Sequence, residues 1–192
     1  MKKIFTAIIL SAFLIVGNNF CSAAMPRNEM YLGGLTYGSS TAQMLRMYKS
    51  PNKTEGGIEY MYDCTYGKSV KISYDAYNNK IFKITVLDNN GWKTPKGLAV
   101  GMSVSQAIEL YGNADFEKYG AEKAAYVYFH NNGKQNDFGF VILADIYTDK
   151  ILAMEITGDN TMATFDDFFE GKINYMLGIE EIDENKSENV TQ

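Results

Sequence analysis

The chain has 192 residues and a net charge of −5, and 46% of its residues are hydrophobic. This is the composition of a globular protein, and the length suits one domain or two small ones. The acidic balance argues against a nucleic-acid binder, which needs an excess of Lys and Arg facing the phosphates. One His and two Cys offer few groups for catalysis or metal binding.

The first 24 residues have the order of a secretory signal peptide. Lys2 and Lys3 precede an apolar run, Ile4–Val16, and small residues follow at positions 22–24. The run is shorter than the roughly 20 apolar residues that a membrane span requires. We therefore expect cleavage at the small residues and a soluble, exported protein, periplasmic or secreted, with no membrane insertion.

Cleavage would change the charge and the thiol content of the chain. The 18 basic residues fall to 16 against 23 acidic ones, a net charge of −7. Cys21 is also lost, which leaves Cys64 as the only thiol. The mature protein is therefore expected to hold its core without an intrachain disulfide.

Two segments of the chain resemble each other. Residues 35–48 align without gaps on residues 98–111, and five of the fourteen positions are identical. This similarity predicts two tandem units, the first over residues 25–90 and the second over residues 91–160.

Each of the two segments begins with the signature of a helix start. Ser40 precedes Gln43 by three residues, as Ser103 precedes Gln106, and this spacing is that of a capping box. The sequence therefore predicts a short helix after each serine, the first of them ended by Pro51.

Beyond each helix, apolar and polar residues alternate with the period of a β-strand. Turn residues such as Gly67 and Asn78 separate the runs. The predicted strands are residues 60–66, 70–74 and 82–86 in the first unit and residues 126–130, 138–144 and 151–156 in the second. Weaker patterns over residues 54–58 and 116–119 indicate one further short strand in each unit.

The C-terminal part shows a different pattern. Apolar residues at helical spacing predict an amphipathic helix over residues 161–179, and residues 180–192 form a polar, acidic tail that we expect to be disordered. The predicted fold is α+β: two tandem repeats of a short helical segment followed by three or four antiparallel strands. The repeats join into one curved sheet with helices on one face, and the C-terminal helix is added to it.

Residues 98–113 carry a resemblance to a known family. The pattern Gly-Met-Ser-x-x-Gln-Ala-x-x-x-Tyr-Gly, residues 101–112, followed by aromatic alternating strands, resembles the beta-lactamase-inhibitor-like group. That group includes tandem-repeat inhibitory proteins and small outer-membrane-protein assembly lipoproteins. The resemblance implies a curved sheet with an exposed concave face. The chain lacks the lipobox of the lipoproteins and the paired cysteines of the inhibitors.

Few residues could support catalysis. Cys64 and His130 would form a nucleophile and base only if the fold brought them together, and their simpler interpretation is a small core residue and a polar strand end. Asp145 and Asp149 flank a turn and could be acids of a hydrolase, although local hydrogen bonding explains them as well. No cluster has zinc or calcium spacing, so we predict no metal, no cofactor and no enzymatic activity.

The aromatic residues are the candidate binding site. Tyrosine gives large contact area and a hydroxyl at small entropy cost, so it is favoured at interfaces. Trp92, in the connector between the two units, either packs against the core or contacts a partner. The candidate binding residues are Tyr60, Tyr62, Tyr74, Trp92, Tyr126 and Tyr128.

The function predicted from these residues is that of an exported binding module of the cell envelope. An aromatic sheet face would recognise another envelope or secreted protein, without catalysis and without nucleic acid. One alternative is a secreted inhibitor of a hydrolase that acts through a loop such as residues 131–137. Another is a protein that binds a glycan or small ligand on the aromatic face.

Overall fold

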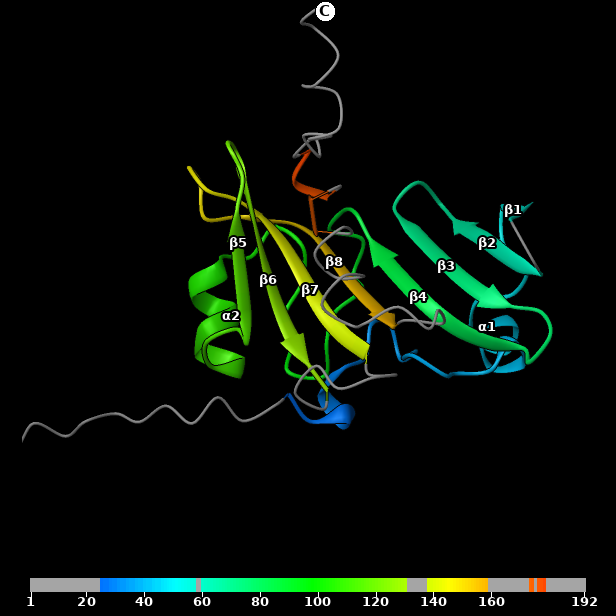
Figure 1. The fold of residues 1–192 in the computed structure, drawn as a ribbon. Helices are drawn as coiled ribbons and strands as arrows, with labels where there is room; N and C mark the ends of the chain where they lie inside the picture. Colours follow the sequence, from blue (N-terminus) through cyan, green and yellow to red (C-terminus); the bar gives the residue numbers. More distant parts are fainter. Residues whose placement is uncertain (1–24, 58–59, 131–137, 159–172, 175, 179–192) are drawn as a thin grey trace, which may run out of the picture.

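The computed structural model describes residues 25–57, 60–130, 138–158, 173–174 and 176–178, and its main element is one antiparallel sheet (Figure 1). The strand order is β1-β2-β3-β4-β8-β7-β6-β5, so β4 and β8 meet at the centre. The strands are β1 (Lys53–Gly56), β2 (Met61–Tyr66), β3 (Val70–Asp75), β4 (Lys80–Val86), β5 (Phe116–Tyr119), β6 (Lys123–Phe129), β7 (Phe138–Asp145) and β8 (Ile151–Gly158).

Two α-helices begin at the predicted serines. For α2 (Val104–Tyr111) the capping box is confirmed, because Ser103 accepts from the backbone of Gln106 and the Gln106 side chain accepts from the backbone of Ser103. For α1 (Thr41–Tyr48) only half of it forms. Ser40 accepts from the Gln43 backbone N–H, whereas the Gln43 side chain donates to a carbonyl elsewhere. A 3-10 turn, η1 (Arg27–Glu29), precedes them.

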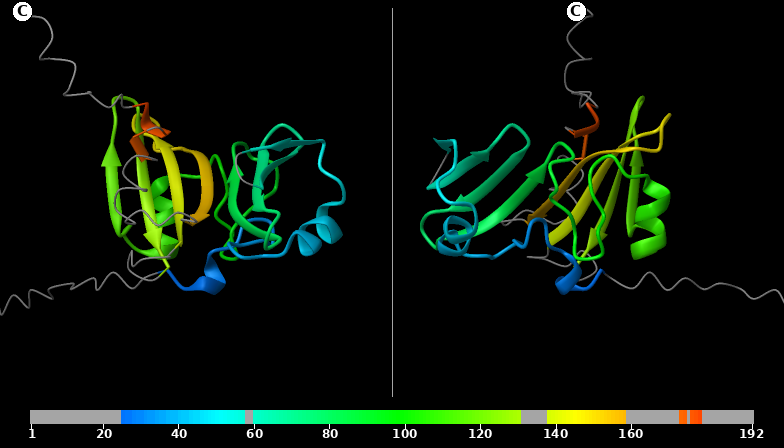
Figure 2. Two further views of the ribbon diagram at one scale, coloured as in Figure 1. Left: turned by 45° about the vertical axis from the view of Figure 1, so that its right-hand side comes forward. Right: turned by 180° about the vertical axis from the view of Figure 1, so that it is seen from behind.

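The main core lies between the sheet and the two α-helices, which are on the same face of the sheet (Figure 2). Alternate residues of every central strand point into it, as the period of two requires. The helices add few side chains to this core: Met44 from α1, and Val104 and Ala107 from α2. Its largest fully buried side chains on the strands are Ile72, Ile81, Ile84, Phe140, Ile142, Ile151 and Met154.

A smaller cluster lies on the opposite face of the sheet. Ala125, Val127 and Val141, from β6 and β7, pack there with Ile173 and Leu177. The described C-terminal residues therefore cover apolar side chains that the helices on the other face do not reach.

The fold class predicted from the sequence, two tandem helix-plus-strand repeats with a C-terminal helix, is wrong. The described residues form a single eight-stranded sheet with two short α-helices, and of that prediction the antiparallel pairing is confirmed. The sheet is continuous where β4 pairs with β8, with Ile84 opposite Ile156, and the physical reason for the difference is the small contribution of the helices to the core. Strands therefore supply most of the core, and each eight-residue helix buries only one or two side chains.

Several predicted segments lie outside the described residues. They are the signal peptide over residues 1–24, the loop over residues 131–137, most of the predicted C-terminal helix and the tail over residues 180–192. None of the helical segments that the structure describes has the length and apolar character needed to cross a membrane.

Candidate functional site

Two of the predicted tyrosines form a stacked pair on the sheet. Tyr62 on β2 lies directly opposite Tyr74 on β3, and their ring centroids are 5.5 Å apart with an interplanar angle of 16°. Burial, followed by the nearby Cys64 and Tyr62, raises the pKa of Tyr74. Because cross-strand aromatic pairs stabilise a sheet, both rings are held in place before anything binds.

Two highly exposed tyrosines lie in the bends at the ends of the strands that carry this pair. Tyr60 is 69% exposed at the bend before β2, and Tyr77 is 87% exposed in the turn between β3 and β4. The two bends are tied together, because the backbone N–H of Ala76 donates to the Tyr60 carbonyl at 2.9 Å. We refer to Tyr60, Tyr62, Tyr74 and Tyr77 as the corner cluster.

The corner cluster reaches the edge of the sheet. Gly56 on β1 is paired with Tyr62, and a Cβ atom added to Gly56 would lie 3.7 Å from the Tyr62 ring. The ring of Tyr62 therefore contacts the outermost strand, and the cluster adjoins an unpaired strand edge.

A second group of tyrosines lies at the other end of the strand order. Tyr119 on β5 and Tyr126 on β6 have ring centroids 6.1 Å apart in an edge-to-face arrangement, and the Tyr119 hydroxyl donates to Glu117 at 2.9 Å. Tyr147, in the turn between β7 and β8, is 76% exposed, and its hydroxyl donates to the Ala121 carbonyl at 3.3 Å. We call Tyr119, Tyr126 and Tyr147 the far cluster.

The remaining two predicted residues belong to the core. The Trp92 ring stacks on Tyr48 with centroids 4.6 Å apart. Of the two roles considered for Trp92, packing within the protein is therefore the one that the structure shows. Tyr128 is only 2% exposed, and its hydroxyl donates to the Gly112 carbonyl at 3.0 Å. The structure therefore brings Tyr62 and Tyr74 into contact, places Tyr60 in the bend before β2, and separates these three from the other three.

The two most exposed tyrosines, Tyr77 and Tyr147, are not among the predicted binding residues. Tyr77 and Tyr147 each come two residues after an aspartate, Asp75 or Asp145, whose side chain accepts from the tyrosine backbone N–H. An aspartate at the start of a tight turn is a known turn signal. The shared spacing Asp-x-Tyr could therefore have placed both rings at turn tips.

Cys64 and His130 do not form a dyad. Cys64 lies on β2 and His130 follows β6, and four strands separate β2 from β6 in the sheet. At about 4.8 Å per strand, the two are separated by roughly 24 Å. Burial raises the pKa of the Cys64 thiol, and the His130 ring stacks on Phe138 with centroids 4.5 Å apart.

Asp145 and Asp149 both form hydrogen bonds at the turn between β7 and β8. Asp145 accepts hydrogen bonds from Tyr147 and Thr148, and the bond from the Thr148 backbone is the main cause that lowers the pKa of Asp145. Asp149 accepts from the Ser105 hydroxyl at 2.9 Å. Within the described ranges, no group of three or more His, Cys, Asp or Glu side chains could hold a metal ion.

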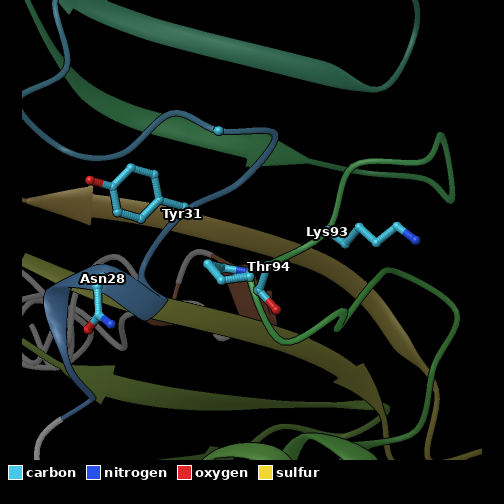
Figure 3. A pocket seen from close by; sticks show the side chains of 6 residues that line it. Asn28, Tyr31, Lys93 and Thr94 are labelled. Atoms are coloured by element: carbon cyan, nitrogen blue, oxygen red, sulfur yellow. The ribbon is translucent and has the colours of Figure 1, made fainter.

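One open pocket lies between the N-terminal segment and the connector before α2 (Figure 3). It has a volume of about 430 Å³. The Thr94 hydroxyl is used within the protein, because it accepts from the Tyr111 hydroxyl at 2.6 Å. The Lys93 side chain extends away from Tyr31. The lining residues are Asn28, Tyr31, Gly34, Lys93, Thr94 and Pro95.

Comparison with known proteins gives weak likenesses. No family model matches the chain, and no curated protein matches it. A solved extracellular protein containing an SCP domain, from Bacillus anthracis, matches with a TM-score of 0.45 and 10% identity, over 64% of this chain and 44% of its own. A cysteine-rich secretory protein from Staphylococcus aureus matches with a TM-score of 0.48 and 10% identity, over 74% of this chain and 54% of its own.

These findings correct the family resemblance inferred from residues 98–113. No family model supports that resemblance, and the two solved structures named above are an SCP-domain protein and a cysteine-rich secretory protein. The pattern that suggested the resemblance is mainly a capping box, which is a local helix-start signature that unrelated helices share. The chain spans about half the length of the two solved proteins, and the likenesses carry no conclusion about its activity.

Proposed function

We propose that this protein is an exported, non-catalytic binding module that recognises another envelope or secreted protein through the corner cluster. The observation that carries the proposal is the exposure of Tyr60 and Tyr77, at 69% and 87%, beside a stacked tyrosine pair. Export rests on the order of charged, apolar and small residues at the start of the chain.

The chemistry of the corner cluster suits a protein surface. A tyrosine ring has only two rotatable side-chain bonds, so immobilising it costs little entropy for the area it contacts. Tyr62 and Tyr74 are already ordered by stacking, which lowers this cost further. Tyr60 and Tyr77 supply the accessible area and free phenol edges, and interface hot spots are enriched in such residues.

The test is a capture experiment with purified protein as bait in an envelope extract. We expect chemical crosslinking to recover the same partner reproducibly, and Tyr60→Ala with Tyr77→Ala to weaken the binding by at least about tenfold, as truncation of two hot-spot residues does. Tyr147→Ala, an equally exposed turn tyrosine in the far cluster, is the matched control. Equal loss in both variants, or no reproducible partner with several baits, would refute the proposal.

A glycan ligand is the second candidate, and one observation favours it. The nearly parallel rings of Tyr62 and Tyr74 are the observation, because sugars pack against aromatic rings of fixed orientation. Titration with neutral oligosaccharides should then shift the tyrosine ring resonances of the corner cluster and leave those of Tyr147 unchanged. If instead the protein inhibits a secreted hydrolase while the double tyrosine variant remains active, the inhibitor alternative replaces both.

A further inference from the structure

Strand β1 is an outer edge of the sheet. It pairs with β2 on one side, and all four of its residues, Lys53–Gly56, are exposed. An edge strand presents backbone N–H and C=O groups that can pair with a strand of another chain.

The register of β1 shows which backbone groups point outward. The N–H of Gly57 donates to the carbonyl of Met61 at 2.7 Å, and Lys53 and Glu55 lie opposite Thr65 and Asp63. In an antiparallel pair, alternate residues exchange hydrogen bonds with the neighbour. Residues 53, 55 and 57 therefore bond to β2, and Thr54 and Gly56 direct their backbone groups away from the sheet.

We infer that the protein self-associates by pairing β1 with β1 of a second copy. A two-fold axis perpendicular to the sheet, passing beside Thr54, places this residue opposite Thr54 of the second copy. Both copies then use their outward backbone groups there. The same register places Lys53 opposite Glu55 of the second copy, and the reverse, on one face. Opposite charges and paired threonines are both favourable cross-strand neighbours, so the strand is complementary to itself.

The charged residues on and beside β1 also favour this pairing. Glu55 lies directly opposite Asp63 on β2, an unfavourable pair of like charges. Within one copy, the Lys53 Nζ lies 2.6 Å from the Glu55 Oε1. In the β1–β1 pairing, Lys53 of the second copy lies beside Glu55 on its open side. Glu55 and Asp63 of each copy then have a Lys53 from both copies nearby.

The other edge of the sheet lacks this complementarity. On β5, residues that face each other across such an axis must be on the same face of the sheet, so they are an even number of positions apart. The two registers that overlap best then oppose Lys118 to Lys118 or Glu117 to Glu117. Either arrangement places like charges together, which protects β5 from self-pairing and leaves β1 as the self-complementary edge.

Charge-reversal variants test the inference by measuring the solution mass in sedimentation equilibrium up to millimolar concentration. The unmodified protein should form a dimer whose dissociation constant rises with salt. Lys53→Glu and Glu55→Lys should each weaken the dimer about tenfold, because two symmetric pairs become repulsive. The double variant Lys53→Glu/Glu55→Lys should restore it, since the pairs are complementary again.

Mixing the two single variants gives a second test. Lys53→Glu supplies two acids on its edge and Glu55→Lys supplies two cations, so an equimolar mixture should form a heterodimer that is tighter than the homodimer of either variant. Glu117→Lys on β5 is the control and should leave the dimer intact. A monomer at all concentrations, a dimer that neither single variant weakens, or one that Glu117→Lys weakens as much overturns the inference. No envelope partner is needed, so this result is independent of the proposed function.

Discussion

Individual tyrosines in this protein have two distinct roles. Tyr128 is 2% exposed, and its hydroxyl donates to the Gly112 carbonyl at the end of α2. Tyr147 is 76% exposed, and its hydroxyl reaches the Ala121 carbonyl at the surface. A buried polar group must be hydrogen-bonded to avoid a desolvation penalty, whereas water can satisfy an exposed one. The hydroxyl should therefore contribute to stability only at Tyr128.

Tyr128→Phe tests this difference. Removal of the buried hydroxyl leaves the Gly112 carbonyl without that donor, so we expect a loss of about 1 kcal/mol in the free energy of unfolding. Tyr147→Phe is the control and should change it by less than about 0.5 kcal/mol. Urea unfolding followed by circular dichroism measures both, and similar losses in the two variants would contradict the assignment.

The raised pKa of a partly buried tyrosine, Tyr66, predicts that the protein loses stability at alkaline pH. Burial raises the pKa of Tyr66 to about 12, whereas a tyrosine in the unfolded chain ionises near 10. The unfolded state therefore loses its proton first. The stability due to this shift is fully present below about pH 10 and is lost as the pH rises towards 12. Tyr66→Phe cannot ionise, so its unfolding free energy should fall less steeply between pH 9 and 12. A slope as steep as that of the unmodified protein would contradict this.

At the scale of elements, the sequence predicted where strands and helices lie more accurately than which of their side chains are buried. Apolar alternation located β3 within one residue, and the Ser103 spacing located the start of α2. Alternation shows which residues share a face but not what covers that face. Tyr62 and Tyr128 therefore had the same pattern, although only Tyr128 is fully buried. The cover of Tyr128 comes from α2 and its flanks, whose placement depends on contacts distant in sequence.

The segment before α1 is fixed by close contact with the connector. Gly33 has φ +57°, and its carbonyl accepts from the Tyr48 hydroxyl. A Cβ atom at Gly33 would lie 2.5 Å from the Trp92 ring. Glycine is therefore required both by the backbone conformation and by the space that Trp92 leaves.

Gly33→Ala should separate these two requirements when compared with Gly67→Ala. Gly67 has φ +61° but has nothing within 4 Å of an added Cβ atom, so it reports the backbone strain alone. We expect Gly33→Ala to be more destabilising by a further 1–3 kcal/mol or so, the usual cost of overpacking. Thermal unfolding measures both variants, and equal losses would show that Trp92 moves aside without cost.

For the whole molecule, the pairing of β4 with β8 makes the sheet one cooperative unit. Ile84 and Ile156 are directly opposite each other and both fully buried. If the two halves of the sheet were independent units, their boundary would fall between β4 and β8, where the structure has a continuous hydrogen-bonded pair. We therefore expect the two halves of the sheet to unfold together.

The single tryptophan allows a direct test. Fluorescence of Trp92 reports the connector and α1, whereas far-ultraviolet circular dichroism reports the whole sheet, and the two urea transitions should coincide. Ile156→Ala should shift both transitions equally, with a loss of about 2–5 kcal/mol. Two separate transitions, or a shift in only one of them, would show that the halves unfold independently.

The β4–β8 seam also has a consequence for the order in which the protein forms. Thr85 and Glu155 hydrogen-bond across it although 70 positions separate them in the chain. During synthesis the N-terminal part appears first, so β2, β3 and β4 can pair with one another long before β8 exists. In that interval β4 has an open edge rich in Ile and Val, the kind of edge that attracts other strands. The nascent chain is therefore exposed to aggregation through this edge until β8 is made.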